Sequence, residues 1–368
     1  LRVVMARFVK LLSGGRQRTQ LNCEMGVGEP GRERFISLPE RRFGCVITMH
    51  LQKGNAQLAS RSRPNNGIVC LITNSSQEFA GKLDIALLAV DDCLRYGGLR
   101  DQLIGLKVVL PDGTIARSGG KVVKNVAGYD LQKLMTGALG TLGVIVEATF
   151  RLYPYAVATA NLSLTFDSII AAQKAMLSIL DTTLVPTAMQ IVVGSEQLPR
   201  LDLRFEGLPE GLEDQLRQVT HLLESPPTSA DDSIWLAREQ LWNTDAGPLR
   251  CIAKLGLLPS NGALCCEMIE RLARTLRLHW SFVFQATGLG LLELSGQNEQ
   301  VLLTALISLR SFLAEQEGHV SILDCPTSMK ASIDVWGDAG DALALMRRVK
   351  QRFDPQAILN PGRFVGRL

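Results

Sequence analysis

The stretch Leu134-Met-Thr-Gly-Ala-Leu-Gly-Thr-Leu-Gly-Val-Ile145 decides the fold that we predict for this chain. Its glycines, Gly137, Gly140 and Gly143, recur at every third position and lead into a β-branched, alternating run that ends before Pro154. Because glycine has no Cβ, the backbone amides of such a loop can approach a bound phosphate or base closely. The stretch therefore predicts a ligand-binding loop that opens into a strand.

The spacing of these glycines differs from the G-x-G-x-x-G fingerprint of nicotinamide-dinucleotide domains. The helical crossover and the acidic ribose partner that accompany that fingerprint are also missing. A second glycine pair, Gly288-Leu-Gly290, precedes a predicted strand and is typical of a turn. The pattern thus disfavours a Rossmann NAD site.

Two further glycine-rich segments precede the loop. The first is Tyr96-Gly-Gly-Leu-Arg-Asp101, and the second is Gly119-Gly-Lys-Val-Val-Lys-Asn-Val-Ala-Gly-Tyr-Asp130. Between them lies a hairpin-like stretch, residues 103–120, in which Pro111-Asp112-Gly113 supplies the turn.

Downstream of the loop, predicted strands alternate with amphipathic helices, and their order suggests two fused split βαβ units. The strands are expected at 161–166, 188–193, 201–205, 249–257, 280–285, 290–294 and 320–323. The helices are expected at 168–180, 211–223, 260–276 and 298–315, with a last helix at 341–353 before a structured tail.

The first part of the chain differs in charge from the rest. Residues 1–63 hold twelve Lys/Arg and four Glu, a net charge of +8, so the +3 total leaves −5 for the remainder. A basic arm can bind nucleic acid or a membrane surface, but these arginines are dispersed and lack interleaved aromatic residues. A poorly structured leader is the favoured interpretation, with short apolar stretches at 43–49 and 68–73.

Composition narrows the class of protein further. The longest apolar runs, such as 302–309, are far shorter than the roughly 18 residues of a membrane span, and residues 1–12 lack the order of a signal peptide. We therefore expect a cytoplasmic protein. The eight cysteines and four histidines show no C-x-x-C or zinc-type spacing, so no metal site is expected. Cys265 and Cys266 are expected to be core thiols, and His279 and His319 to be structural.

From Arg95 to Phe364 the chain resembles the FAD-linked oxidoreductases of the vanillyl-alcohol-oxidase (PCMH) type. It is most similar to the smaller of the two FAD-binding subunits of bacterial glycolate oxidase. The resemblance rests on the order of the segments quoted above, together with Glu239-Gln-Leu-Trp242, Val335-Trp-Gly337 and Phe353-Asp-Pro-Gln-Ala-Ile-Leu-Asn-Pro-Gly362. It implies an α+β fold: a PCMH-type FAD-binding domain, a ferredoxin-like α+β cap and a C-terminal tail that returns to the flavin edge.

The resemblance also implies which residues contact FAD. The strand-forming part of the loop looks like the family element whose backbone reads the adenine, and the segments on either side match family positions near the flavin. Lys124 is placed to stabilise a reduced flavin, with a solvated loop lysine as the alternative. The implied cofactor-binding residues are Gly97, Gly98, Asp101, Lys124, Asn125, Gly137, Gly140, Thr141, Leu142, Gly143, Val144, Ile145 and Asn360.

Residues 1–93 do not fit the family. The expected pyrophosphate loop, of Arg-Gly-Gly-Gly or Gly-Asn-Gly-Ser type, and a second Thr-Leu-Gly-Gly loop are not found there. We therefore predict an atypical or incomplete first lobe at 1–93, from truncation or a frameshift. The expected domains that follow are a second FAD lobe at 94–156, a cap at 157–330 and a helix with the flavin-edge tail at 331–368.

The function that the resemblance implies is oxidation of glycolate, or a similar 2-hydroxy acid, to the 2-oxo acid. Electrons would pass to an iron-sulfur subunit rather than to NAD, within a complex that holds a larger paralogous flavoprotein subunit and that can be peripheral to a membrane. No catalytic base is identified. The alternative is a flavin-free or decayed paralogue that serves as an assembly scaffold, because a chain without the pyrophosphate loops would retain FAD weakly.

Overall fold

The computed structural model describes residues 48–49, 71–72, 93–120, 129–151, 153, 156–223, 226–243 and 249–368. These residues divide into two compact units. The first unit holds the described residues up to 72, 99–153 and 341–368, and the second holds 93–98 and 156–340. Apart from two short strands and Cys93, the predicted first lobe at 1–93 lies outside the described residues.

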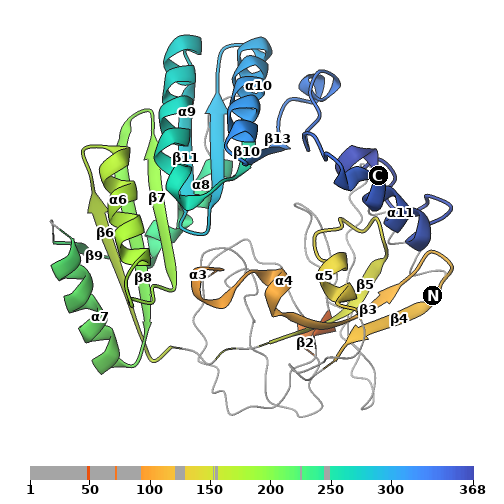
Figure 1. The fold of residues 1–368 in the computed structure, drawn as a ribbon, viewed down its shortest axis with the longest axis horizontal. Helices are drawn as coiled ribbons and strands as arrows, with labels where there is room; N and C mark the ends of the chain where they lie inside the picture. Colours follow the sequence, from red (N-terminus) through yellow and green to blue (C-terminus); the bar gives the residue numbers. More distant parts are fainter. Residues whose placement is uncertain are drawn as a thin grey trace, which may run out of the picture. The chain divides into compact units, whose positions relative to one another are not determined.

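The first unit is built on a mixed sheet (Figure 1) with the strand order β2-β1-β5-β3-β4. Strand β3 pairs antiparallel with both β4 and β5, whereas β1 pairs parallel with β2 and β5. Its elements are β1 (Thr48–Met49), β2 (Leu71–Ile72), α4 (Leu99–Gln102), β3 (Leu103–Val109), β4 (Ile115–Gly119), α5 (Leu131–Met135), β5 (Val144–Phe150), α11 (Ala342–Phe353) and η4 (Val365–Arg367).

The hairpin predicted around Pro111-Asp112-Gly113 is confirmed as β3 and β4. Gly113 donates its backbone N–H to the Leu110 carbonyl at 2.9 Å and has a φ of 85°, a conformation that favours glycine. The Asp112 carboxylate accepts from the Thr114 backbone N–H at 2.9 Å and closes the turn. The turn residues thus fix the register in which β3 meets β4.

The second unit contains two successive βαββαβ repeats, which confirms the ferredoxin-like α+β cap. The first repeat is β6 (Ala158–Thr165), α6 (Ile169–Leu180), β7 (Ala188–Gly194), β8 (Gln197–Gly207), α7 (Pro209–Leu222) and β9 (Thr228–Ala230). The second repeat is β10 (Arg250–Gly256), α9 (Gly262–Leu276), β11 (His279–Gln285), β12 (Leu289–Ser295), α10 (Glu299–Glu315) and β13 (His319–Asp324).

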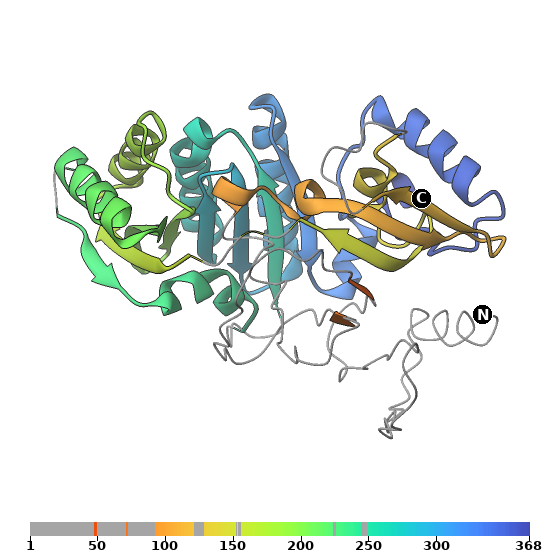
Figure 2. The same cartoon turned by 90° about the horizontal axis from the view of Figure 1, so that it is seen from below.

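The two repeats form one continuous sheet, with the order β13-β10-β12-β11-β7-β8-β6-β9 among the described strands. The repeats meet where β7 pairs antiparallel with β11. Helices α6, α7, α9 and α10 cover one face of this sheet (Figure 2), where they bury a core that includes Phe282, Phe284 and Leu203. Because strand side chains alternate, the neighbouring residues of each strand project from the opposite face.

That opposite face carries a smaller apolar cluster beneath α8 (Ala237–Asn243), which follows η1 (Asp232–Leu236). The remaining elements of the second unit are α3 (Cys93–Tyr96), η2 (Pro259–Asn261) and η3 (Thr327–Ala331).

The strands and helices that we predicted for this unit are confirmed, and their ends differ from the prediction by a few residues. Strand β9 was missed because three exposed or half-buried residues after a Pro-Pro pair show no strand period.

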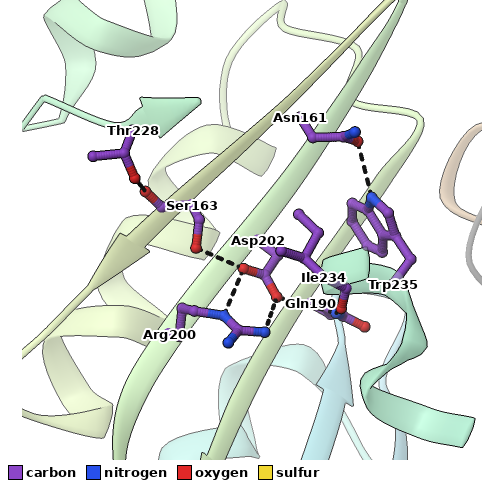
Figure 3. A network of polar contacts seen from close by, with 8 residues as sticks. All are labelled: Asn161, Ser163, Gln190, Arg200, Asp202, Thr228, Ile234 and Trp235. Carbon is purple, nitrogen blue, oxygen red and sulfur yellow. Dashed lines mark hydrogen bonds and ion pairs between the residues drawn. The ribbon is translucent and has the colours of Figure 1, made fainter. Parts of the chain in front are cut away.

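A buried carboxylate, Asp202 of β8, is paired in the first repeat on the sheet face opposite α6 and α7 (Figure 3). Arg200 donates to both of its oxygens at 2.9 and 3.0 Å, Ser163 donates at 2.8 Å, and Gln190 donates at 3.1 Å. Asp202 is fully buried, so these charge-assisted bonds replace the hydration that its carboxylate loses.

Substitution of Asp202 with Asn should lower the stability of the second unit by about 2 kcal/mol, because it leaves Arg200 without its bidentate acceptor. The measurement is urea unfolding followed by tryptophan fluorescence, since all four tryptophans lie within residues 154–340. Asp214→Asn is the control, because the pair between Asp214 and Arg217 is exposed and its loss should change stability by less than about 0.5 kcal/mol. Equal effects of the two substitutions would contradict the prediction.

Candidate functional site

The candidate site is the loop between α5 and β5 in the first unit, residues 136–143, called here the glycine loop. Three of its residues have a left-handed backbone: Gly137 (φ 79°), Leu139 (φ 52°) and Gly140 (φ 71°). The Thr141 hydroxyl donates to the Ala138 carbonyl at 2.7 Å inside the loop, where Thr141 is buried. The loop therefore has a fixed shape in which two of the three left-handed positions are glycine.

Packing explains the third glycine. A Cβ on Gly143 would lie 2.4 Å from the Cγ2 atom of Val108 on β3, which is too close for any side chain. Leu142 beside it joins the core of the first unit. Val144 and Ile145 then begin β5 and pair with Val109 and Val108. Gly143 thus lets the glycine loop enter the sheet directly.

The C-terminal tail holds the glycine loop through a buried lysine that the sequence patterns did not indicate. Lys350 of α11 is buried, and its Nζ donates to the carbonyl of Thr141 at 2.7 Å, to Asp354 Oδ2 at 2.6 Å and to the carbonyl of Leu359 at 2.8 Å. These three acceptors match the three donors of an ammonium group. Lys350 therefore ties together the loop, the helix and the tail.

Asp354 closes the turn that follows α11. Its carboxylate accepts from the backbone N–H groups of Ile358 at 3.1 Å and Leu359 at 2.8 Å. Burial alone would raise the pKa of Asp354, but the hydrogen bonds from Lys350, Leu359 and Ile358 outweigh it and hold this pKa below its usual range. The folded chain thus keeps Asp354 ionised opposite the Lys350 ammonium.

Asn360 makes the second contact between tail and loop. It has a φ of 43°, and its Nδ2 donates to the Leu139 carbonyl at 2.7 Å. A Cβ on Gly140 would lie 3.0 Å from this Nδ2, so glycine also leaves room for the asparagine. Leu139 and Gly140 are both exposed residues, and their backbone N–H groups donate to no described residue. The two amides can bind an acceptor atom of a ligand.

The structure brings together most of the predicted cofactor residues, but not all. Eight of them lie in the glycine loop, at the start of β5 or in the tail that contacts the loop: Gly137, Gly140, Thr141, Leu142, Gly143, Val144, Ile145 and Asn360. Asp101 is exposed on α4 of the first unit, away from that loop in sequence, and Gly97 and Gly98 belong to the second unit. Lys124 and Asn125 lie outside the described residues.

The sequence signal for Lys350 was a lysine in the last turn of the predicted helix 341–353, four residues before the aspartate that follows that helix. Such pairs are mostly exposed, so the spacing alone did not distinguish this one.

The core-thiol interpretation is confirmed for Cys265 and Cys266, which are buried in the second unit, and burial raises the pKa of Cys265 to about 12. Within the described residues, no group of three His, Cys, Asp or Glu is arranged to hold a metal ion. None of the helices described here has the length and apolar character to cross a membrane.

Comparison with known proteins gives matches in sequence and in fold. Residues 337–364, which contain Lys350 and Asn360, match the family model of the FAD linked oxidases, C-terminal domain. The chain is 39% identical over 116 residues to glycolate oxidase subunit GlcD of Bacillus subtilis (strain 168), covering 32% of this chain and 25% of that protein. It is 41% identical over 90 residues to glycolate oxidase subunit GlcE of Escherichia coli (strain K12), covering 24% of this chain and 25% of that protein.

A longer and weaker match is to the mitochondrial D-lactate dehydrogenase (cytochrome) of Arabidopsis thaliana, 25% identical over 324 residues, covering 74% of this chain and 54% of that protein. The chain thus spans 54% or less of the length of these relatives. Among solved structures, alkyldihydroxyacetonephosphate synthase matches with a TM-score of 0.53 at 15% identity, covering 75% of this chain and 57% of that one. This likeness shows the fold.

The matched segments are similar to FAD-linked oxidoreductases: residues 337–364 to the C-terminal domain of the FAD linked oxidases, and other stretches to glycolate oxidase subunits. Within that class, the sequence similarity extends to both glycolate oxidase flavoprotein subunits and to D-lactate dehydrogenases.

Replacement of Lys350 with Met should destabilise the first unit by about 2 to 4 kcal/mol, because it leaves the buried Asp354 carboxylate without its cation. Amide hydrogen exchange of residues 342–368 measures the effect, and tryptophan fluorescence of the second unit should stay unchanged. Lys133→Met is the matched control, since the pair between Lys133 and Asp130 is exposed. Unchanged exchange in the Lys350 variant would contradict the assigned role.

The same contact predicts a dependence on pH. Because the pKa of Asp354 is lower in the folded chain than in the unfolded chain, its ionised form stabilises the tail fully above pH ~4. That contribution is lost as the pH falls through the folded pKa. The measurement compares hydrogen exchange of the tail in the wild type and in Asp354→Asn, with rates corrected for pH. The tail of the wild type should exchange more slowly than that of Asp354→Asn at pH 7, and the two rates should become equal in acid. A difference in exchange rate that stays constant with pH would contradict the prediction.

Proposed function

We propose that this chain is an FAD-linked oxidoreductase subunit that takes part in oxidising a small 2-hydroxy acid, such as glycolate, to the 2-oxo acid. The observation that carries the proposal is the glycine loop. Leu139 and Gly140 are exposed in it, their amides have no described acceptor, and the tail segment that contacts it matches the FAD linked oxidases. The glycolate oxidase and D-lactate dehydrogenase relatives support the substrate class.

The described residues fit one part of FAD. Backbone N–H donors next to left-handed glycines suit the acceptor atoms of a nucleotide, because no side chain blocks their approach. Lys350 and Asn360 act through the Thr141 and Leu139 carbonyls and position these donors rather than contact the nucleotide. FAD, when bound, supplies the acceptor for the hydride that leaves C2 of the hydroxy acid.

We further propose that the chain corresponds to the smaller flavoprotein subunit of a glycolate oxidase, the counterpart of the relative named GlcE. A larger flavoprotein subunit and an iron-sulfur subunit would be its partners and would receive the electrons in place of NAD. The matches to proteins named as subunits GlcD and GlcE support an assembly of several chains. A cytoplasmic location, with peripheral contact to a membrane through the complex, stays a prediction from the sequence.

A flavin-free scaffold is the second candidate function. The observation that favours it is the lack of the family's two phosphate-binding sequences in residues 1–93. Since the amides of such loops offset the charge of the pyrophosphate, a chain without them would bind FAD weakly.

The visible absorption spectrum of the purified, desalted chain separates the two functions. Retained flavin bands are expected, and a colourless chain that rejects added FAD would leave the scaffold. Gly140→Ala should reduce the retained flavin several-fold, because its methyl group would meet Asn360 beside the open amides. Gly113→Ala is the control, since Gly113 has the same left-handed backbone and open space around it. Equal flavin content in both variants would contradict the role of the glycine loop.

A further inference from the structure

The outward surface of the C-terminal segment, residues 341–368, is strongly basic. This segment holds six basic and two acidic residues, a net charge of +4, whereas residues 154–340 hold 12 basic and 22 acidic residues, a net charge of −10. Its one lysine, Lys350, is buried and paired with Asp354, so all of its exposed basic residues are arginines. A basic surface thus follows an acidic unit along the chain.

Most of these arginines have no partner within the protein. Four exposed arginines form no hydrogen bond or ion pair with any residue that the structure describes: Arg347, Arg348, Arg352 and Arg367. On α9, by contrast, the exposed Arg274 pairs with Glu270 one helical turn away. On α11, Arg348 lies one turn before Arg352, and like charges at this spacing repel each other. An external anion would offset this repulsion.

Two exposed apolar side chains lie among the arginines. Leu345 is 62% exposed and precedes Arg348 by three residues and Arg352 by seven, so the three side chains share one face of α11. Ile358 is 53% exposed and lies in the turn that Asp354 closes after the helix. The surface therefore combines positive charge with exposed apolar groups.

The other face of α11 is packed within the first unit. Val349 and Phe353 pack against the core of that unit. At the start of the helix, a Cβ on Gly366 would collide with Leu343, so the end of the tail lies directly against the first turn and brings Arg367 beside it. These contacts hold the arginines on a fixed scaffold. Because the apolar face of α11 is used inside the protein, the helix can lie on another surface but cannot insert into it.

The residue types indicate what this surface binds. A guanidinium group binds phosphate bidentately, and clusters of basic residues on a helix are typical of contacts with anionic lipids. Exposed aliphatic side chains beside them can enter the boundary between headgroups and acyl chains. Nucleic acid is disfavoured, since Phe353 and Phe364, the two aromatic residues of the segment, are half-buried and leave no exposed ring for a base to stack on.

We propose that the outward surface of residues 341–368 binds anionic phospholipids and holds the chain on the face of a membrane. The four arginines contact headgroup phosphates, and Leu345 and Ile358 enter the lipid boundary. The negative charge of the membrane attracts this segment and repels the acidic second unit, so the chain binds through its tail. The proposal does not depend on FAD binding.

The test is sedimentation of the full chain with vesicles of phosphatidylglycerol and phosphatidylcholine, and with vesicles of phosphatidylcholine alone, at about 0.1 M salt. Wild type should bind the anionic vesicles at least about tenfold more tightly than the neutral ones. A triple variant should lose at least about tenfold of this binding, because each arginine near the surface adds to the attraction. Its substitutions are Arg347→Gln, Arg348→Gln and Arg352→Gln.

A matched control removes the same charge from exposed positions of the second unit and should change vesicle binding by less than about twofold. Its substitutions are Arg217→Gln, Arg271→Gln and Arg274→Gln. Hydrogen exchange of residues 342–368 confirms that the tail of each variant is folded. Absence of binding to anionic vesicles, equal binding to both kinds of vesicle, or equal losses in the two triple variants would each overturn the proposal.

A second comparison separates a lipid surface from an acidic protein. Leu345→Gln should weaken binding to the anionic vesicles several-fold and leave binding to poly-L-glutamate unchanged, because only the lipid boundary takes up the leucine. If Leu345→Gln leaves vesicle binding unchanged, or weakens the binding of both probes equally, the lipid assignment is wrong and the surface fits an acidic protein partner.

Discussion

The buried ammonium of Lys350 is the contact on which the first unit depends. It joins the Thr141 carbonyl of the glycine loop, 209 residues away in sequence, to Asp354 at the end of α11 and the Leu359 carbonyl of the tail. A buried cation is stable only when its donors are all matched, so removal of any one partner disturbs the other two. This requirement makes the tail part of the loop's structure rather than an appendage to it.

The second unit follows a different principle, that of a duplicated fold with unequal polar faces. Both repeats pack the same kind of apolar core beneath their helices, because the inward positions of the equivalent strands are apolar in each. The opposite face of the sheet, where α8 packs, is where the two repeats differ. The first repeat encloses Asp202 in its own network, and the second surrounds Glu293 of β12, the acid at the equivalent position, with Leu291 and Ile252.

The candidate nucleotide-binding feature of the first unit rests on backbone groups rather than on particular side chains. The glycine loop offers backbone donors of defined direction, which is how nucleotides are bound without reliance on particular side chains. Stable tertiary contacts within this unit hold these groups in place, and loss of such support is a common reason for loss of binding.

The sequence by itself determined the α+β class, the hairpin at Pro111-Asp112-Gly113, the order of strands and helices in both repeats except for β9, and the place of the glycine loop. These features follow from local turn chemistry and from the period of apolar residues, which neighbours in sequence specify. The tertiary structure alone decided that Lys350 is buried, that Gly143 is required by Val108, and that Glu293 lacks the partners that Asp202 has. Each of these depends on contacts between residues far apart in the chain, where burial and pairing turn an ordinary lysine, glycine or glutamate into one with a specific role.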